Sequence, residues 1–268
     1  MERYGQYAET NTVHSLVIYE WASQIDMKDA RHTFDRISGI VGHPPDLATV
    51  VDENEGKDYP YASFMKRNII QKKEWLSFGY LWKRSDQILS DFSIDIGCAI
   101  RNFRCVEVHI DETSVEDISS LFEKVLSIIA DGINPIYGIG YKMPYYWGPR
   151  EFAHGTASSR YSVSDKSLFG APDRLKQQSF QFSRTFHSRN EERHLDIDLR
   201  DVFEINLISE GHLNRRVGRK SLRDWIKANE LGVLEQMTPV TWRWNVPVAE
   251  ICKARKDLID AGITVVKE

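Results

Sequence analysis

One amphipathic helix between two strand-like segments constrains the fold of this chain more than any other feature. The helix is predicted between Ser114 and Asp131, because Ser114 and Asp117 have the spacing of a capping box. Its apolar residues recur at helical spacing: Val115, Ile118, Leu121, Phe122, Val125, Ile128 and Ile129. Gly132 and the pair Asn134-Pro135 are expected to end it. An apolar helix face of this length needs a sheet to cover it.

The segments before this helix alternate apolar and polar residues, as strands do. Residues 75–82, 92–100 and 104–110 predict three antiparallel strands, and residues 136–141 predict a return strand after the helix. We therefore expect an α+β fold, with an antiparallel-rich sheet, helices packed on one face and ferredoxin-like character.

Both ends of the chain show further elements. Earlier residues predict a strand at 14–21, a helix at 27–41 capped by Asp26, a strand at 47–51 and a charged loop at 52–58. Later residues predict strands at 195–199, 203–207, 241–246 and 263–266, with helices starting at Ser221 and Pro247. Residues 175–187 fit either a strand or a helix. The 268 residues would form a single domain, 1–268, or two packed α+β halves of about 1–143 and 144–268.

Composition narrows the classes of function. Hydrophobic residues make up 41% and charged residues 28%, which is typical of a soluble globular protein. The sequence contains neither a long apolar run nor a leader pattern, so we expect a cytoplasmic protein without a membrane partner. Three cysteines without a Cys-x-x-Cys pair argue against disulfides and thiolate zinc sites. A net charge of −4 makes a nucleic-acid partner an unfavoured expectation.

Two patterns keep an enzyme as the alternative function. His194, Asp196 and Asp198 would share one face of an extended strand and could bind a divalent metal, although a solvated polar face has the same pattern. His154-Gly155-Thr156 resembles the His-Gly-Thr start of some ADP-ribosyltransferases, which would imply Tyr161 with Glu204 or Glu210 as partners. An isolated tripeptide also arises by chance, so we expect no metal and no cofactor.

Other reactive or charged residues have simpler interpretations. Cys98 and Cys105 are expected to fill space, since the sequence places no histidine in an obvious pairing position. The basic cluster Arg215, Arg216, Arg219 and Lys220 would suit a nucleic-acid-binding module, but the acidic chain as a whole favours a solvated turn.

The loop after residue 143 is the favoured binding site. Tyr145, Tyr146, Trp147 and Arg150 combine aromatic and arginine side chains, which are enriched where proteins bind each other. The rings could instead fold into the protein's own core.

Three segments resemble bacterial type VI secretion immunity proteins of polymorphic-toxin systems. They are Asp131–Gly138, Asp201–Ser209 and Trp242-Arg243-Trp244. The resemblance implies a cytoplasmic, non-enzymatic protein that binds a toxin and covers its active site, and mild acidity would suit a basic toxin. A recessed polar cavity crowded with ionisable groups would argue against this hypothesis.

Overall fold

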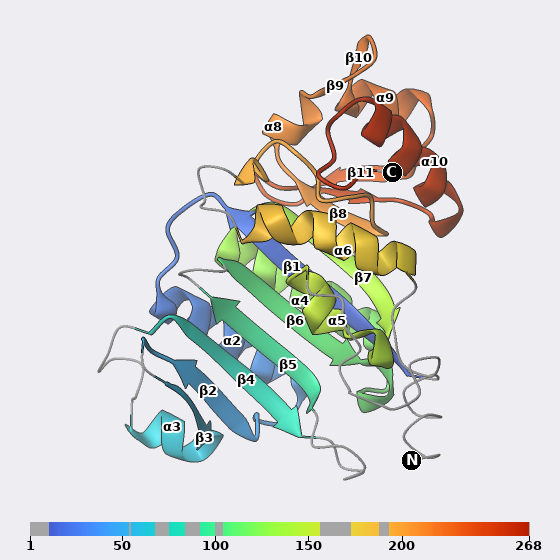
Figure 1. Ribbon diagram of the computed structural model, residues 1–268. Helices are drawn as coiled ribbons and strands as arrows, with labels where there is room; N and C mark the ends of the chain where they lie inside the picture. Colours follow the sequence, from blue (N-terminus) through green and yellow to red (C-terminus); the bar gives the residue numbers. More distant parts are fainter. Residues whose placement is uncertain are drawn as a thin grey trace.

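The computed structural model describes residues 11–53, 55–67, 75–83, 92–99, 104–155, 173–187 and 193–267. Ten strands form one sheet in the order β11-β12-β8-β7-β1-β6-β5-β4-β2-β3, and every pairing in it is antiparallel (Figure 1). Its strands are β1 (Thr12–Trp21), β2 (Leu47–Val51), β3 (Gly56–Pro60), β4 (Ser77–Lys83), β5 (Phe92–Ala99), β6 (Cys105–Asp111), β7 (Pro135–Pro144), β8 (Ile205–Ile208), β11 (Val233–Gln236) and β12 (Trp242–Asn245). The predicted α+β class is confirmed.

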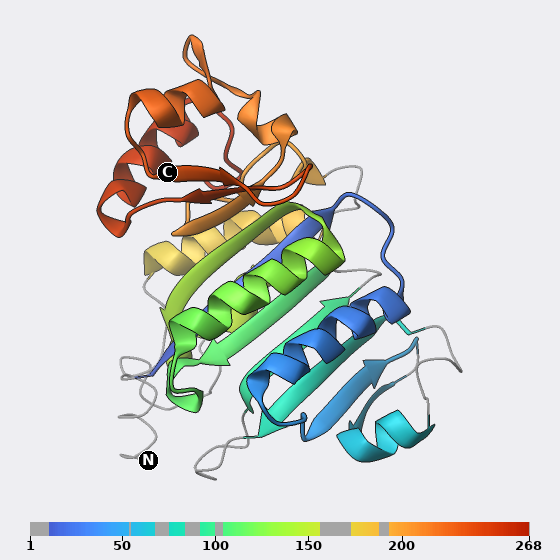
Figure 2. The same ribbon diagram turned by 180° about the vertical axis from the view of Figure 1, so that it is seen from behind.

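Helices lie on both faces of this sheet. Helices α2 (Met27–Val41) and α4 (Ile118–Ile133) lie side by side across one face (Figure 2). Helices α5 (Pro149–Ala153) and α6 (Asp173–Phe186) lie on the other face (Figure 1). Strand β1 contributes side chains to the cores on both faces. Leu16 and Ile18 are buried in the core beneath α2 and α4, whereas Val17 and Tyr19 are buried in the opposite core. This alternation follows from the period of two in an extended chain.

Capping residues set the ends of the two long helices. Asp26 caps α2, as predicted, and forms a capping box with Asp29, and Gly42 ends the helix in the left-handed conformation. Helix α4 differs from the prediction, because its N-cap is Asp117, which accepts from the Ser120 amide. Ser114 ends the short 3-10 helix η2 (Glu112–Ser114) instead. The C-cap of α4 is Asn134 at φ 54°, while Gly132 remains inside the helix.

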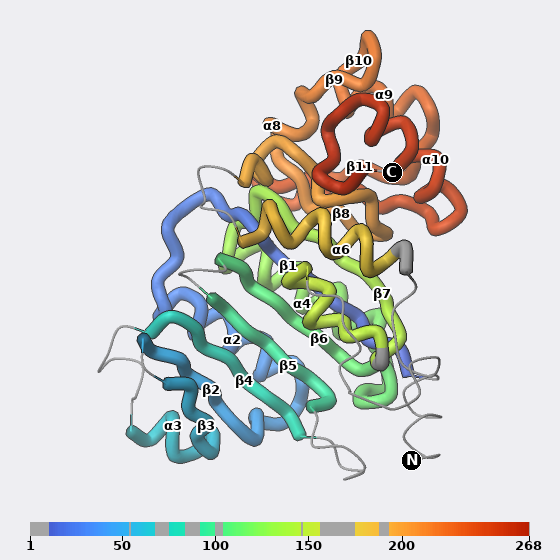
Figure 3. The backbone as a smooth tube through the Cα atoms, viewed as in Figure 1, coloured from blue at the N-terminus to red at the C-terminus, as the bar shows by residue number. Residues whose placement is uncertain are grey.

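The C-terminal third gathers at the end of the sheet beyond β7, where β8, β12 and the edge strand β11 lie (Figure 3). Strand β8 pairs with β7, and β12 pairs with β8, so the three segments that resemble immunity proteins contribute to adjacent strands. The remaining elements are α3 (Tyr61–Arg67), η3 (Tyr145–Trp147), α8 (Glu210–Leu213), α9 (Leu222–Ala228), α10 (Val248–Asp260) and the hairpin of β9 (Arg216–Val217) and β10 (Lys220–Ser221).

Four local predictions meet different outcomes. Residues 175–186 of the ambiguous segment are helical in α6, where Phe182 and Phe186 pack edge-on against Tyr19. The predicted strand at 195–199 is wrong, because the Ile197 and Asp198 amides donate to the His194 carbonyl and form a turn. The predicted strand at 263–266 makes just a bridge between Thr264 and Leu199. The predicted loop at 52–58 gives way to edge strand β3 from Gly56.

A buried arginine fixes α5 over the sheet. Arg200 is 1% exposed and its guanidinium donates to the Tyr19 hydroxyl and to the carbonyls of Phe152 and Ala153. It also lies 4.1 Å and 4.0 Å from the ring centres of Phe152 and Phe182. These contacts join β1, α5 and α6, and thereby position His154 directly after α5. In the described residues, no helix is long and apolar enough to cross a membrane.

Candidate functional site

Strand register brings ionisable residues together on the face that α5 covers. In β5 and β6, Asp95 pairs with His109 and Gly97 pairs with Glu107. Gly97 gives the glutamate room, since a Cβ on that glycine would lie 3.3 Å from Glu107 Oε1. Cys105, Glu107 and His109 alternate with Val106, Val108 and Ile110, which enter the opposite core. A single strand therefore carries an apolar row on one face and a reactive row on the other.

Glu107 is the centre of this ionic cluster. Glu107 is 3% exposed, and its carboxylate lies 3.0 Å from His154 Nε2, 3.2 Å from His109 Nε2 and 3.3 Å from Arg150 Nε. Burial alone would raise the pKa of Glu107, but His154, Arg150 and the imidazole hydrogen bonds lower it well below the usual value. The carboxylate is therefore ionised and satisfied by three donors.

The two histidines bound to Glu107 have different surroundings. His109 Nδ1 lies 2.9 Å from the hydroxyl of Ser15, which is fully buried in β1. His154 is 29% exposed, and its ring stacks on Phe186 at 5.6 Å. Burial alone would lower the pKa of His154, whereas the Glu107 carboxylate raises it above its ordinary value. His154 therefore favours the protonated form beside Glu107.

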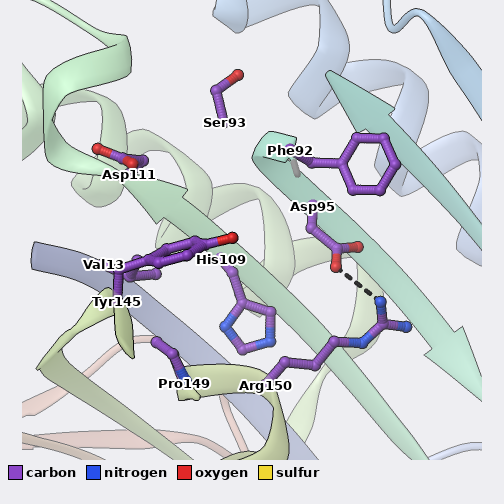
Figure 4. Close-up of a pocket in the computed structure, with 9 residues that line it drawn as sticks. All are labelled: Val13, Phe92, Ser93, Asp95, His109, Asp111, Tyr145, Pro149 and Arg150. Atoms are coloured by element: carbon purple, nitrogen blue, oxygen red, sulfur yellow. Dashed lines mark hydrogen bonds and ion pairs between the residues drawn. The ribbon is translucent and has the colours of Figure 1, made fainter. Parts of the chain in front are cut away.

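Arg150 separates two hollows on this face. Its guanidinium lies 3.0 Å from Asp95 and is drawn bonded to it in Figure 4. On one side is a small hollow of about 30 Å³, into which His109 and Tyr145 point. On the other side a cavity of about 290 Å³ extends over β2, β4 and β5. Its lining includes Thr49, Ser77, Gly79, Gly97, Cys105, Glu107 and His154. We call this larger space the sheet groove.

Cys105 lines the same groove, beside a histidine that the sequence did not indicate. Its Sγ lies 4.0 Å from His154 Nε2, so a histidine does lie beside this thiol. The two residues are 49 positions apart, and neither spacing nor local pattern indicates the contact. Burial, with a further contribution from Glu107, raises the pKa of the Cys105 thiol well above its usual value. The thiol is therefore protonated and a poor nucleophile in this form.

The geometry does not form a catalytic relay. A relay uses both imidazole nitrogens, one toward the nucleophile and one toward the carboxylate. Here a single nitrogen, His154 Nε2, faces both Cys105 and Glu107. The Ser15–His109–Glu107 chain does use two nitrogens, but the Ser15 hydroxyl is fully buried and does not line either hollow. The recessed ionisable cluster thus exists, and its members bind one another.

Of the four predicted partner-binding residues, Tyr145 and Arg150 line the hollows described above. Tyr145 is 2% exposed, and its ring lines the small hollow. Trp147 is half-buried against the core beneath α5 and α6. The Arg150 side chain is 43% exposed and holds the ion pairs with Asp95 and Glu107. The side chain of Tyr146 lies outside the described residues. Partner binding by this segment stays a prediction.

The two enzymatic patterns are not assembled as expected. Within the described ranges, the cluster with metal-ligand spacing is Cys105, Glu107 and His154, instead of His194, Asp196 and Asp198. His194 and Asp196 are exposed in a turn, and Asp198 binds Arg215 at 2.9 Å.

The partners proposed for His154 are placed elsewhere. Glu204 lines a separate pocket with His14 and Lys142, and Glu210 binds Arg223 at 2.6 Å. Tyr161 lies outside the described residues. His154 is instead bound to Glu107, so the ADP-ribosyltransferase pattern finds no assembled counterpart in the described part of the chain.

The basic cluster forms the exposed hairpin of β9 and β10. Gly218 turns the chain at φ 60°, and Arg216 donates to the Arg219 carbonyl. Arg215 reaches back to Asp198 and the Gly262 carbonyl. One of the four cations thereby supports the hairpin turn, and a second pairs with a carboxylate elsewhere in the chain.

Comparisons with known proteins identify a fold and no sequence family. No protein-family model matches the sequence, and no curated protein matches it. Among solved structures, the chain is similar in fold to the Pseudomonas aeruginosa T6SS protein PA0821, with a TM-score of 0.53 and 13% sequence identity. The match covers 95% of this chain and 76% of that chain.

Proposed function

We propose that this chain is a cytoplasmic immunity protein associated with type VI secretion, which neutralises a toxin by binding it without catalysis. The observation that carries the proposal is the likeness in fold to a T6SS protein, which extends over 95% of this chain. The three segments that resemble immunity proteins lie in and around adjacent strands β7, β8 and β12, which is consistent with the same assignment.

The ionic cluster supports binding more than catalysis. Glu107 accepts from three neighbours, and the Cys105 thiol is buried and protonated. Such mutual pairing rigidifies a surface, whereas a catalytic group must be available to a substrate. The chain has a net charge of −4 and would be attracted to a basic toxin surface.

We propose the sheet groove and its α5 wall as the toxin-binding surface. The groove floor carries small or short side chains at Thr49, Ser77, Gly79 and Gly97, so a partner can approach the sheet closely. Arg150 lines the groove with 43% of its side chain exposed. An arginine beside an apolar hollow is the chemistry of interface hot spots.

A competition experiment tests the function. The gene would be deleted in its host, and the deletion strain grown with the parent strain, which retains the toxin. The deletion strain should be outcompeted while the parent's secretion apparatus is intact, and should grow equally well once that apparatus is disabled. Equal growth of the deletion strain beside the fully active parent would refute an immunity role.

Complementation with variants tests the surface. Ser77→Arg would place a long charged side chain in the groove and leave every residue of the Glu107 cluster unmutated, and this variant should fail to restore protection. Val248→Arg adds the same charge at a residue that is 68% exposed at the start of α10. This matched control should protect like the unmodified chain. Both variants must first show the unmodified circular dichroism and melting temperature. Full protection by Ser77→Arg would move the binding surface away from the groove while leaving the immunity role intact.

A further inference from the structure

We propose that Cys105, Glu107 and His154 form a zinc-binding site at the wall of the sheet groove. A thiolate, a carboxylate oxygen and an imidazole nitrogen are all ligands that Zn²⁺ accepts in tetrahedral geometry. The two ligands in β6 lie two residues apart on one face of the strand, and the third follows α5, which Arg200 fixes in place. Rigid elements thus supply all three ligands.

The distances between the ligand atoms lie on either side of the spacing that one ion requires. With Zn–S near 2.3 Å and Zn–N and Zn–O near 2.0–2.2 Å, tetrahedral ligands lie roughly 3.3–3.6 Å apart. His154 Nε2 lies 3.0 Å from Glu107 Oε2 and 4.0 Å from Cys105 Sγ, and the three ligand atoms all lie within 4.8 Å of one another. Cys105 Sγ and Glu107 Oε2 both lie near His154 Nε2, so one ion placed between the three atoms could bind all of them. Small side-chain rotations would complete the geometry.

The surroundings supply the other requirements of a zinc site. His109 donates to Glu107 and is itself bound to Ser15, so the carboxylate is oriented by a second layer of hydrogen bonds. The sheet groove is lined by all three ligands, which gives an ion a route of entry and leaves a fourth position for water.

Zn²⁺ can replace two protons of this cluster without a change in its net charge, even though Arg150 lies nearby. Binding of Zn²⁺ would displace the proton of the Cys105 thiol and the proton shared between His154 and Glu107, so two protons leave for one divalent cation. The net charge of the cluster is unchanged. Arg150 is bound to the other carboxylate oxygen, Oε1, and to Asp95, so it can stay in place.

Cobalt titration of the purified full-length chain tests the site. The chain should bind one Co²⁺ with a thiolate-to-cobalt charge-transfer band and visible bands of tetrahedral geometry, and one equivalent of Zn²⁺ should abolish both. Cys105→Ser should lose the charge-transfer band. His154→Gln, at a partly exposed position, should weaken binding at least tenfold, consistent with the loss of one ligand.

Cys252→Ser is the matched control, because Cys252 is the exposed thiol and would account for adventitious binding. This variant should bind Co²⁺ like the unmodified chain. Absence of the charge-transfer band from the unmodified chain would overturn the proposal, as would its survival in both Cys105→Ser and His154→Gln. If Cys105→Ser fails to fold, His154→Gln decides alone. None of these measurements requires the toxin, so failure here leaves the immunity proposal standing.

Discussion

The two faces of the sheet are stabilised by different interactions, although the same strands form both. The face beneath α2 and α4 is apolar, and Val106, Val108 and Ile110 of β6 lie in it. The face beneath α5 combines an aromatic core with Glu107, His109 and Cys105 from the same strand. The first face is stabilised by area removed from water, and the second depends on every buried charge having its partner. The two faces should therefore respond differently to mutation and to pH.

Removal of Glu107 should have the largest effect. Glu107→Ala leaves His154, His109 and Arg150 without their shared carboxylate, and loss of one member of a buried ionic group costs about 3–5 kcal/mol. Urea unfolding followed by circular dichroism would measure the free energy of unfolding.

Glu123→Ala is the matched control for this glutamate. Glu123 also binds an arginine, through two bonds of 2.6 and 2.7 Å to Arg243, but its side chain is 54% exposed. Its removal should cost about 0–1 kcal/mol. Equal costs for the two glutamates would mean that buried charge does not stabilise the α5 face.

On the opposite face, Leu126→Ala should cost about 2–5 kcal/mol, because a fully buried leucine leaves a cavity beneath α4. No titratable group is removed, so this cost should be the same at pH 5 and pH 9. Unfolding at the two pH values would check this. A cost that changed strongly with pH would show that the two faces are not independent.

The shifted pKa values of His154 and Glu107 make the stability of the α5 face depend on pH. The raised pKa of His154 gives stability that is complete below about pH 6.5 and is lost as pH rises through the folded-state pKa. The lowered pKa of Glu107 gives stability present above about pH 4.3 and lost as pH falls through its folded-state pKa. This pair is therefore at its strongest between those limits.

His154→Gln tests that dependence. The variant should cost about 1–2 kcal/mol near pH 6 and less at pH 9, where the unmodified chain has already lost the charged imidazole. His212 is a contrasting histidine, since burial lowers its pKa to about 3, and its contribution is lost as pH falls below about 6.5. Unfolding across pH 5–9 would separate the two. If His154→Gln lowered the free energy of unfolding equally near pH 6 and at pH 9, the raised pKa of His154 would be contradicted.

Sequence periodicity predicts the apolar face well and the α5 face poorly. Helix α2 and strand β2 have the predicted bounds, and the strands β4, β5 and β6 form where alternation indicated them. These elements bury one face in a way that neighbouring residues reveal. The Glu107 cluster instead joins residues from β5, β6 and α5, which only strand register and the Arg200 anchor bring together.

The strand predicted at 195–199 is wrong for a related physical reason. Leu195 and Leu199 are buried and alternate with polar residues, but His194 adopts φ 51° and its carbonyl accepts two amides. A compact turn can bury the same leucines as a strand, so alternation over so few residues does not separate the two.

Mutations of the helix caps should have the smallest effect on stability. They test whether α4, on the apolar face, begins after Asp117 or at the predicted Ser114. Asp117→Ala should cost about 1 kcal/mol, because it removes the acceptor of the Ser120 amide at the start of α4. Asp26→Ala, which removes the acceptor of the Lys28 and Asp29 amides in α2, should cost about the same. Asp117→Asn retains a capping side chain and should stay within a few tenths of a kcal/mol of the unmodified chain, by the similar ranking of Asn and Asp at this position. Urea unfolding at pH 7 would compare the three variants. If Asp117→Ala proved neutral, α4 would begin elsewhere, and the predicted start at Ser114 would again be the better assignment.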